Sequence, residues 1–244
     1  VLPASAWPEK DGTVTNTNRQ VQRGRKAVEL PGEARQDWWI TNEIAQRVGC
    51  DWGFSNPSEI YAEMASVMPS LDNISWERVS AEESVTYPCR APDLPGDEIV
   101  FSDGFPTSSG RGKLVPASII PPDELPDETF PMVLTTGRQL EHWHTGAMTR
   151  RAAVLDELEP EAVASLSPGD MSSMAIEPGS MIRVSTRRGV LELRARADGA
   201  VPKGMVFIPF CYAEAPANML TNQALDPYGK IPEFKSCAAK VEAV

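Results

Sequence analysis

The sequence predicts a mixed α/β chain that begins with the end of an α/β domain and continues into a β-barrel. Two helical patterns of apolar residues fall between residues 36 and 68, whereas residues 113–244 carry short strand patterns separated by Gly and Pro. Short strands at close spacing with few long helices are typical of a barrel and not of a doubly wound sheet. Residues 70–112 are punctuated by Pro and Gly and show little periodicity, which predicts a domain boundary there.

Two helices are expected in the first third of the chain. Residues 36–48 place two Trp, two Ile and a Val at near-helical spacing, and Gly49 follows as a C-terminal cap. Asn56 is suited to cap a second helix through residue 68, with Pro57 at its first position. Two short helices bury too little apolar surface by themselves, so we expect them to pack against strands outside this sequence.

Six segments have the composition of strands, namely residues 98–101, 113–117, 132–136, 181–186, 190–195 and 205–210. Residues 181–186 and 190–195 alternate apolar and polar side chains. They are joined by Arg187-Arg188-Gly189, which predicts a β-hairpin. The acidic, Pro-rich residues 121–129 predict a loop.

Charge and cysteine content exclude several classes of protein. The net charge is 23 − 34 = −11, which disfavours broad binding to nucleic acid or to an anionic membrane. No apolar run approaches the roughly 18–20 residues that span a bilayer, and no signal peptide is recognisable. The cysteines are scattered without a CxxC pair, which disfavours zinc, iron–sulfur and dense disulfide frameworks and favours a cytoplasmic protein: Cys50, Cys89, Cys211 and Cys237. The sequence does not begin with Met, and we expect it to be a piece of a longer polypeptide.

The residues best suited to ligand binding follow the expected strand at 132–136. Residues 135–151 read TTGRQLEHWHTGAMTRR and contain both histidines of the chain. Their side chains are of the types that pair with phosphates, stack on heterocycles and bridge to ring edges: Arg138, Arg150 and Arg151; Trp143; and Thr136, Thr145 and Thr149. Together they predict a nucleotide-like ligand bearing a diphosphate. A structural turn around a packed Trp is the alternative.

Other chemistries have less support in the sequence. His142 and His144 stand two residues apart with no nearby set of Cys or carboxylates, which disfavours a metal site. There is no GxSxG motif and no Cys/His pair at a recognisable spacing for nucleophilic catalysis. Glycine-rich phosphate loops of the GxGxxG or P-loop type are absent as well.

Residues 136–151, TGRQLEHWHTGAMTRR, resemble the segment that opens the C-terminal dinucleotide-binding domain of the molybdopterin oxidoreductases. The resemblance is greatest to cytoplasmic NAD-linked formate dehydrogenases and to nitrate reductases of the periplasmic and assimilatory type. It covers essentially the whole chain. Residues 2–28, LPASAWPEKDGTVTNTNRQVQRGRKAV, resemble the end of the catalytic α/β domains. SMIRVSTRRGVLELRARA and the run from VPKGMVFIPF to SCAAKVE resemble the rest of the C-terminal barrel.

The resemblance implies a domain order and a set of site residues. Residues 1–85 would end a catalytic α/β domain, 86–110 would connect, and 111–244 would form a double-psi β-barrel that binds molybdopterin dinucleotide. The residues implied to line the pterin and diphosphate are Thr136, Gly137, Arg138, Gln139, Leu140, Glu141, His142, Trp143, His144 and Thr145, with Asn218 and Lys235 as further cofactor-binding residues and Phe210 on the substrate side. Many relatives have His or Trp where Cys211 stands, a departure that bears on the polarity of the substrate-side wall.

The function implied is that of the C-terminal portion of a formate dehydrogenase catalytic subunit, which oxidises formate to CO₂. The implied cofactor is bis-molybdopterin guanine dinucleotide with molybdenum or tungsten. Electrons would leave through iron–sulfur clusters to FMN and NAD on a flavin-containing, NADH-dehydrogenase-like partner subunit. The family's metal ligand, cluster cysteines and active-site His and Arg precede the matched segments, so no catalytic residue and no metal ligand is expected here. The alternatives are a nitrate reductase of the same family and a non-catalytic pterin-binding barrel.

Overall fold

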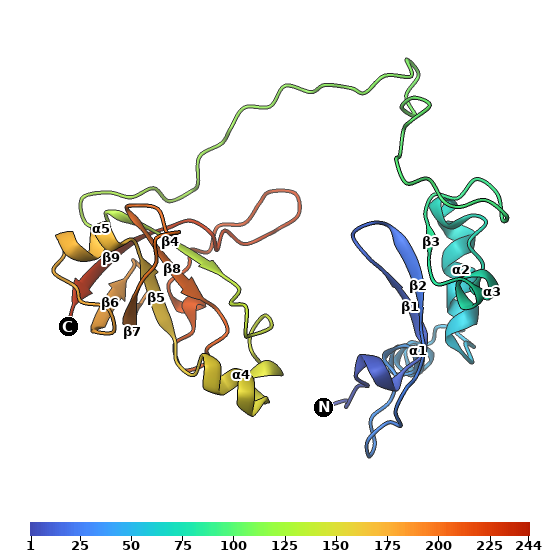
Figure 1. The fold of residues 1–244 in the computed structure, drawn as a ribbon, viewed down its shortest axis with the longest axis horizontal. Helices are drawn as coiled ribbons and strands as arrows, with labels where there is room; N and C mark the ends of the chain where they lie inside the picture. The colour runs from blue at the N-terminus through green and yellow to red at the C-terminus, as the bar shows by residue number, and fades with distance from the viewer. The chain divides into compact units, whose positions relative to one another are not determined.

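The computed structural model describes residues 1–244 as two compact units, Val1–Val115 and Pro116–Val244 (Figure 1). In the first unit, strands β1 (Gly12–Thr15), β2 (Gln20–Gly24) and β3 (Val85–Thr86) form a three-stranded antiparallel sheet in the order β1-β2-β3. Arg23 of β2 lies over the ring of Trp76, with its Cζ atom 3.9 Å from the ring centroid. The sheet is therefore packed against the helical part of the same unit.

Both helices expected in the first unit are present as α1 (Asp37–Arg47) and α2 (Pro57–Val67). The Asn56 side chain accepts hydrogen bonds from the backbone N–H groups of Ser58 and Glu59, which confirms its role as the cap of α2. A short helix α3 (Trp76–Ala81) and the 3₁₀ turns η1 (Trp7–Glu9) and η2 (Pro69–Leu71) complete the unit. Its core consists of Val21, Tyr61, Leu71, Ile74, Val79, Val85 and Cys89.

Residues 87–131 contain neither helix nor strand. The strands expected at 98–101 and 113–117 are therefore wrong. At the first position the Arg19 guanidinium donates to the carbonyl oxygens of Asp97 and Glu98, at 3.0 and 2.6 Å, in place of a neighbouring strand. At the second the chain has no partner strand, and the side chain of Leu114 is 96% exposed. Strand composition without a partner gives only an extended chain.

The second unit is a closed six-stranded barrel, as expected. Its strands are β4 (Met132–Gly137), β5 (Val163–Leu166), β6 (Met181–Ser185), β7 (Val190–Ala197), β8 (Met205–Pro209) and β9 (Cys237–Ala243). They follow the order β4-β8-β5-β7-β6-β9, and β9 pairs with β4 to close the barrel. The pairs β4/β8 and β5/β7 are parallel, whereas the other four are antiparallel. This mixture of directions fits the double-psi barrel that the resemblance implies.

The barrel core is formed by the apolar residues that alternate along its strands. In β6, Ile182 and Val184 are buried and their neighbours Met181 and Arg183 are exposed. The expected hairpin between β6 and β7 is present, and the N–H of Thr186 donates to the carbonyl of Gly189 at 2.9 Å. Four expected strands, at 132–136, 181–186, 190–195 and 205–210, are thereby confirmed as β4, β6, β7 and β8.

Short helices fill the connections of the barrel: η3 (Thr149–Arg151), α4 (Ala153–Leu158), α5 (Pro168–Ser173) and η4 (Ala217–Met219). Ser167 caps the N-terminus of helix α5, and its Oγ accepts a hydrogen bond from the N–H of Asp170. The buried Asp170 carboxylate accepts from the N–H of Gly204 at 2.7 Å, just before β8. Asp170 thus fixes the start of β8 against α5.

Residues 121–129 form the expected loop, and it is held to the barrel through Glu124. The Glu124 carboxylate pairs with the guanidinium groups of Arg187 and Arg188, from the β6–β7 turn. It also accepts from the N–H of Ala238 in β9, at 3.2 Å. We call Glu124, Arg187 and Arg188 the Glu124 cluster. It joins the loop, the hairpin turn and β9.

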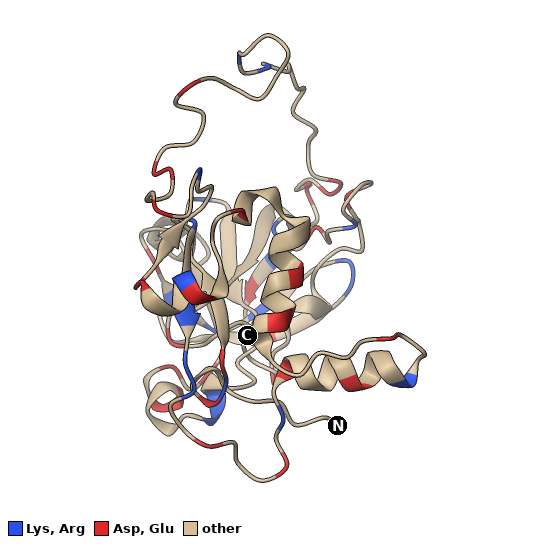
Figure 2. Cartoon of the chain, turned by 90° about the vertical axis from the view of Figure 1, so that its right-hand side faces the viewer, with Lys and Arg blue, Asp and Glu red and all other residues tan.

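No helix in the structure is long and apolar enough to cross a membrane. Acidic and basic residues are interspersed along helices and loops (Figure 2). Many of them pair locally, as Arg183 does with Glu192 across the β6–β7 hairpin at 2.7 Å. The net charge of −11 is therefore spread over the chain.

Candidate functional site

The expected binding segment, residues 136–145, begins at the end of β4. Thr136 and Gly137 are buried, and Gly137 pairs with Pro209 of the parallel strand β8. The N–H of Phe210 donates to the carbonyl of Gly137 at 3.1 Å. A Cβ atom on residue 137 would lie 2.5 Å from the ring of Phe207, so any other residue there would force that ring to shift. Phe210 therefore lies directly beside the start of the segment.

Lys235 contacts the same strand end. Its Nζ donates to the carbonyl oxygen of Thr136, and the Thr136 hydroxyl donates to the carbonyl of Phe234 at 2.7 Å. Thr136 is thus hydrogen-bonded to two consecutive residues, Phe234 and Lys235, that lie almost 100 positions away in sequence. The structure therefore brings Lys235 and the 136–145 segment together, although a lone Lys carries no sequence pattern that would have shown it without the resemblance.

His142 is the most buried polar residue of the segment, at 1% exposure. Its Nε2 lies 2.8 Å from the carbonyl oxygen of Glu159. A carbonyl oxygen only accepts, so Nε2 carries the proton in this hydrogen bond. The Nδ1 atom is buried without a hydrogen-bond partner in the chain, as is the Nε2 atom of Gln139. Two polar atoms of the segment are thus left without partners of their own.

Other residues of the segment face solvent. Trp143 is 58% exposed and Leu140 is 96% exposed, and Arg138 and Thr145 are exposed as well. His144 adopts a positive φ of 49° and lies with its Nε2 3.3 Å from the Arg138 guanidinium. The Trp143 and His144 rings meet edge to face at 4.5 Å. An exposed indole next to Arg and His offers both a stacking face and donors for an anion.

Arg150 differs from the expectation that it pairs with a phosphate. Its guanidinium is occupied by Asp156, by Glu214 at 2.8 Å and by the carbonyl of Pro160 at 3.2 Å. Residue type alone suggested an anion ligand, but two carboxylates of the chain already neutralise this Arg. Arg151 is exposed, so Arg138 and Arg151 stay available to a phosphate.

Sequence reasoning missed Tyr212. This residue is 1% exposed, and its hydroxyl donates to the carbonyl of Glu159 at 3.0 Å, the same oxygen that His142 contacts. The Tyr212 and His142 rings meet edge to face at 5.7 Å, and Arg150 covers the Tyr212 ring with its Cζ 4.7 Å from the centroid. Burial raises the pKa of Tyr212 above its ordinary value, so its hydroxyl keeps its proton. A single Tyr after Cys211 carries no sequence signal for this role.

The segment ends against Cys211. A Cβ on Gly146 would lie 2.6 Å from the Cys211 carbonyl oxygen, and the φ of Gly146 is +72°, so Gly is required there. Cys211 is buried, and burial raises the pKa of its thiol. Asn218 lies in η4 with an exposed side chain, and its contacts do not join it to the 136–145 segment. Asn218 and the remaining site residues stay predictions as cofactor contacts.

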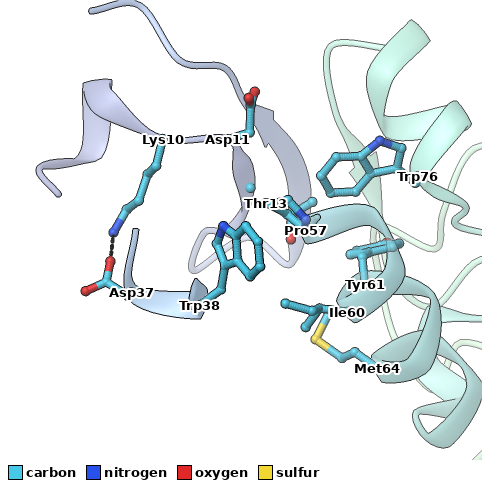
Figure 3. A pocket seen from close by; sticks show the side chains of 11 residues that line it. Lys10, Asp11, Thr13, Asp37, Trp38, Pro57, Ile60, Tyr61, Met64 and Trp76 are labelled. Atoms are coloured by element: carbon cyan, nitrogen blue, oxygen red, sulfur yellow. Dashed lines mark hydrogen bonds and ion pairs between the residues drawn. The ribbon is translucent and has the colours of Figure 1, made fainter. Parts of the chain in front are cut away.

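No group of three or more His, Cys, Asp or Glu is placed to hold a metal ion, and all four cysteines are free. The first unit contains a cavity of about 240 Å³ between the β1 region and helices α1 and α2. Figure 3 shows Trp38, Ile60, Met64 and Trp76 around it and the Lys10–Asp37 ion pair at one side. Ligand sites commonly exceed about 300 Å³ and combine apolar walls with converging polar groups. This cavity is too small for a dinucleotide.

Comparison with known proteins agrees with the barrel described above. Residues 132–238 match the model of the molydopterin dinucleotide binding domain, and residues 1–47 match that of molybdopterin oxidoreductase. Both matches relate the chain to the molybdopterin oxidoreductases.

Its relatives include formate dehydrogenases. The chain is 42% identical, over its whole length, to the F420-dependent formate dehydrogenase subunit alpha of Methanocaldococcus jannaschii, of which it covers 36%. It is 34% identical to a putative formate dehydrogenase of Staphylococcus haemolyticus, of which it covers 25%. The chain thus spans about a third or less of these relatives. Acetylene hydratase from Pelobacter acetylenicus shares the fold, with a TM-score of 0.73 and 23% identity over 100% of this chain and 38% of that one.

Proposed function

We propose that this chain forms the C-terminal part of the alpha subunit of a formate dehydrogenase and binds part of a bis-molybdopterin guanine dinucleotide. The observation that carries the proposal is the 42% identity to a formate dehydrogenase alpha subunit over the whole chain. In this proposal residues 1–85 end the catalytic α/β domain, 86–110 connect, and 111–244 form the dinucleotide-binding barrel.

The chemistry of the 136–145 segment fits such a cofactor. Trp143 offers an exposed ring for stacking, Arg138 and His144 offer donors for a diphosphate, and the unpartnered polar atoms of Gln139 and His142 suit a pterin rich in donors and acceptors. Thr136, Gly137, Leu140, Glu141 and Thr145 would complete the wall, with Lys235 and Asn218 as further contacts and Phe210 on the substrate side. When bound, the cofactor supplies two-electron redox chemistry at molybdenum or tungsten, and this chain supplies binding, orientation and electrostatics.

The reaction proposed for the intact protein is formate → CO₂ + H⁺ + 2 e⁻. The electrons would pass through iron–sulfur clusters held by the rest of the alpha subunit to a flavin-containing partner subunit in the cytoplasm. NAD is the acceptor that the sequence resemblance implies. Three relatives that are 40–42% identical are named F420-dependent, which supports F420 as the competing acceptor.

The test uses the intact complex that contains this chain. Purified enzyme is supplied with formate and either NAD or F420, and separately with nitrate and a reduced dye. We expect formate oxidation with one of the two acceptors and no nitrate reduction. Nitrate reduction without formate oxidation would contradict the proposal and favour the nitrate reductase alternative. An intact polypeptide of 26.6 kDa that carries no pterin would instead favour a non-catalytic barrel.

A further inference from the structure

His142 is held on one side only. Its Nε2–H donates to the Glu159 carbonyl at 2.8 Å, and the Nδ1 atom has no partner in the chain although the residue is 1% exposed. A neutral imidazole that donates through one nitrogen keeps a lone pair on the other. A buried acceptor without a donor is destabilising, and an N–H donor from a bound ligand would remove that penalty.

Tyr212 restricts this His in two ways. Its ring meets the imidazole edge to face, with centroids 5.7 Å apart and an angle of 84° between the planes. Its hydroxyl donates to the same Glu159 carbonyl at 3.0 Å, so both lone pairs of that oxygen are used. Tyr212 in turn lies under the Arg150 guanidinium, which Glu214 and Asp156 hold. The Glu159 carbonyl is thus fixed in place from two sides.

We propose that Tyr212 is a positioning residue for the cofactor: together with the Glu159 carbonyl it fixes His142 in the Nε2–H tautomer, which presents the Nδ1 lone pair to an N–H donor of the pterin. The proposal rests on the proposed function, since it requires that a pterin binds at the 136–145 segment. Tyr212 itself contacts no ligand in this account. Its effect reaches the cofactor only through His142.

The first experiment measures cofactor retention in the Tyr212→Phe variant of the intact protein. The variant keeps the ring and loses only the hydroxyl. Purified protein is diluted, incubated and passed over a desalting column, and retained molybdenum and tungsten are measured by mass spectrometry against time. We expect metal and pterin to be lost about 3- to 10-fold faster than from wild type, the effect of one hydrogen bond.

Tyr61→Phe is the matched control. Tyr61 is also buried, and its hydroxyl also donates to a backbone carbonyl, that of Ile74 at 2.8 Å, but it lies in the core of the first unit. Both substitutions should lower the unfolding midpoint by similar amounts, whereas only Tyr212→Phe should speed cofactor loss. Equal rates of loss in the two variants would overturn the proposal and leave Tyr212 as a purely structural residue.

A double-mutant cycle tests whether Tyr212 acts through His142. His142→Leu removes the Nδ1 acceptor, so adding Tyr212→Phe to it should not speed cofactor loss further. If the two substitutions each increase the rate of cofactor loss and their increases multiply in the double variant, the proposal is contradicted. Wild-type protein that carries no pterin would overturn this inference together with the proposed function. If the wild-type protein carries pterin but the two substitutions act independently on the rate of cofactor loss, the inference is overturned and the proposed function stands.

Discussion

At the scale of single residues, the strand end at Thr136 depends on a charge from a distant part of the sequence. The Lys235 ammonium donates to the Thr136 carbonyl, and the Thr136 hydroxyl donates to the carbonyl of Phe234. Because both contacts fix the point where the 136–145 segment leaves β4, Lys235 would act on the cofactor through the position of this segment as well as through its own charge.

We therefore expect Lys235→Met to lower the fraction of protein that carries molybdenum or tungsten. The substitution leaves the Thr136 carbonyl without its donor, a loss of about 1–3 kcal/mol. Metal content per polypeptide, measured after purification at limiting cofactor, reports the effect. The control is Lys203→Met, because Lys203 is exposed and forms no ion pair. Equal metal content in both variants would show that Lys235 does not contribute to cofactor binding.

At the scale of elements, residues 121–129, the β6–β7 turn and β9 are joined by the Glu124 cluster. Hydrogen bonds from Arg188, then from Arg187 and the Ala238 N–H, lower the pKa of Glu124 in spite of its burial. The folded chain thus binds a proton at Glu124 less well than the unfolded chain. The stability gained is present above the unfolded pKa, about 4.3, and is lost as pH falls through the folded pKa.

Glu124→Gln should accordingly reduce the stability of the chain at pH 7 by about 1–3 kcal/mol, because two guanidinium groups lose a charged acceptor. Urea unfolding at a series of pH values measures this, and the difference from wild type should shrink as pH falls below about 4.3. Glu192→Gln is the control, since the exposed Arg183–Glu192 pair is worth about 0–1 kcal/mol. If the difference in the free energy of unfolding between Glu124→Gln and wild type does not change with pH, the lowered pKa of Glu124 does not stabilise the chain.

Sequence patterns predicted the strands that alternate or form a clear apolar run, and missed β5 and β9. Strands β6 and β7 were predictable because one face is buried and the other is in solvent. Strand β5 is buried at every position, and β9 is rich in Ala, so neither shows the pattern of a half-exposed strand. Residues 113–117 have strand composition, but strand formation requires a partner that composition does not reveal.

In the candidate site, too, some features could be predicted from the sequence and others could not. The position of residues 136–145 at a strand end followed from the sequence, because an apolar run predicts the buried strand that precedes them. The ion-pair partners of Arg150 could not be predicted from the sequence, because Asp156 and Glu214 lie in different parts of the chain. Tyr212 contacts Glu159 across 53 positions, a distance in sequence that no motif spans.

At the scale of the whole molecule, the chain has a first unit of helices and a small sheet, and a barrel that matches the molydopterin dinucleotide binding domain. It covers 36% of the M. jannaschii alpha subunit and 25% of the S. haemolyticus relative. No group of side chains in either unit is placed to hold a metal ion.

We propose above that the 136–145 segment binds the molybdopterin dinucleotide. The most direct measurement is an electron cryomicroscopy map of the intact, cofactor-loaded complex. We predict density for a pterin dinucleotide against Trp143, Arg138 and His142, with the Lys235 ammonium at the end of β4. Density for the cofactor that contacts other parts of the barrel, with the 136–145 segment free of ligand, would contradict this binding site.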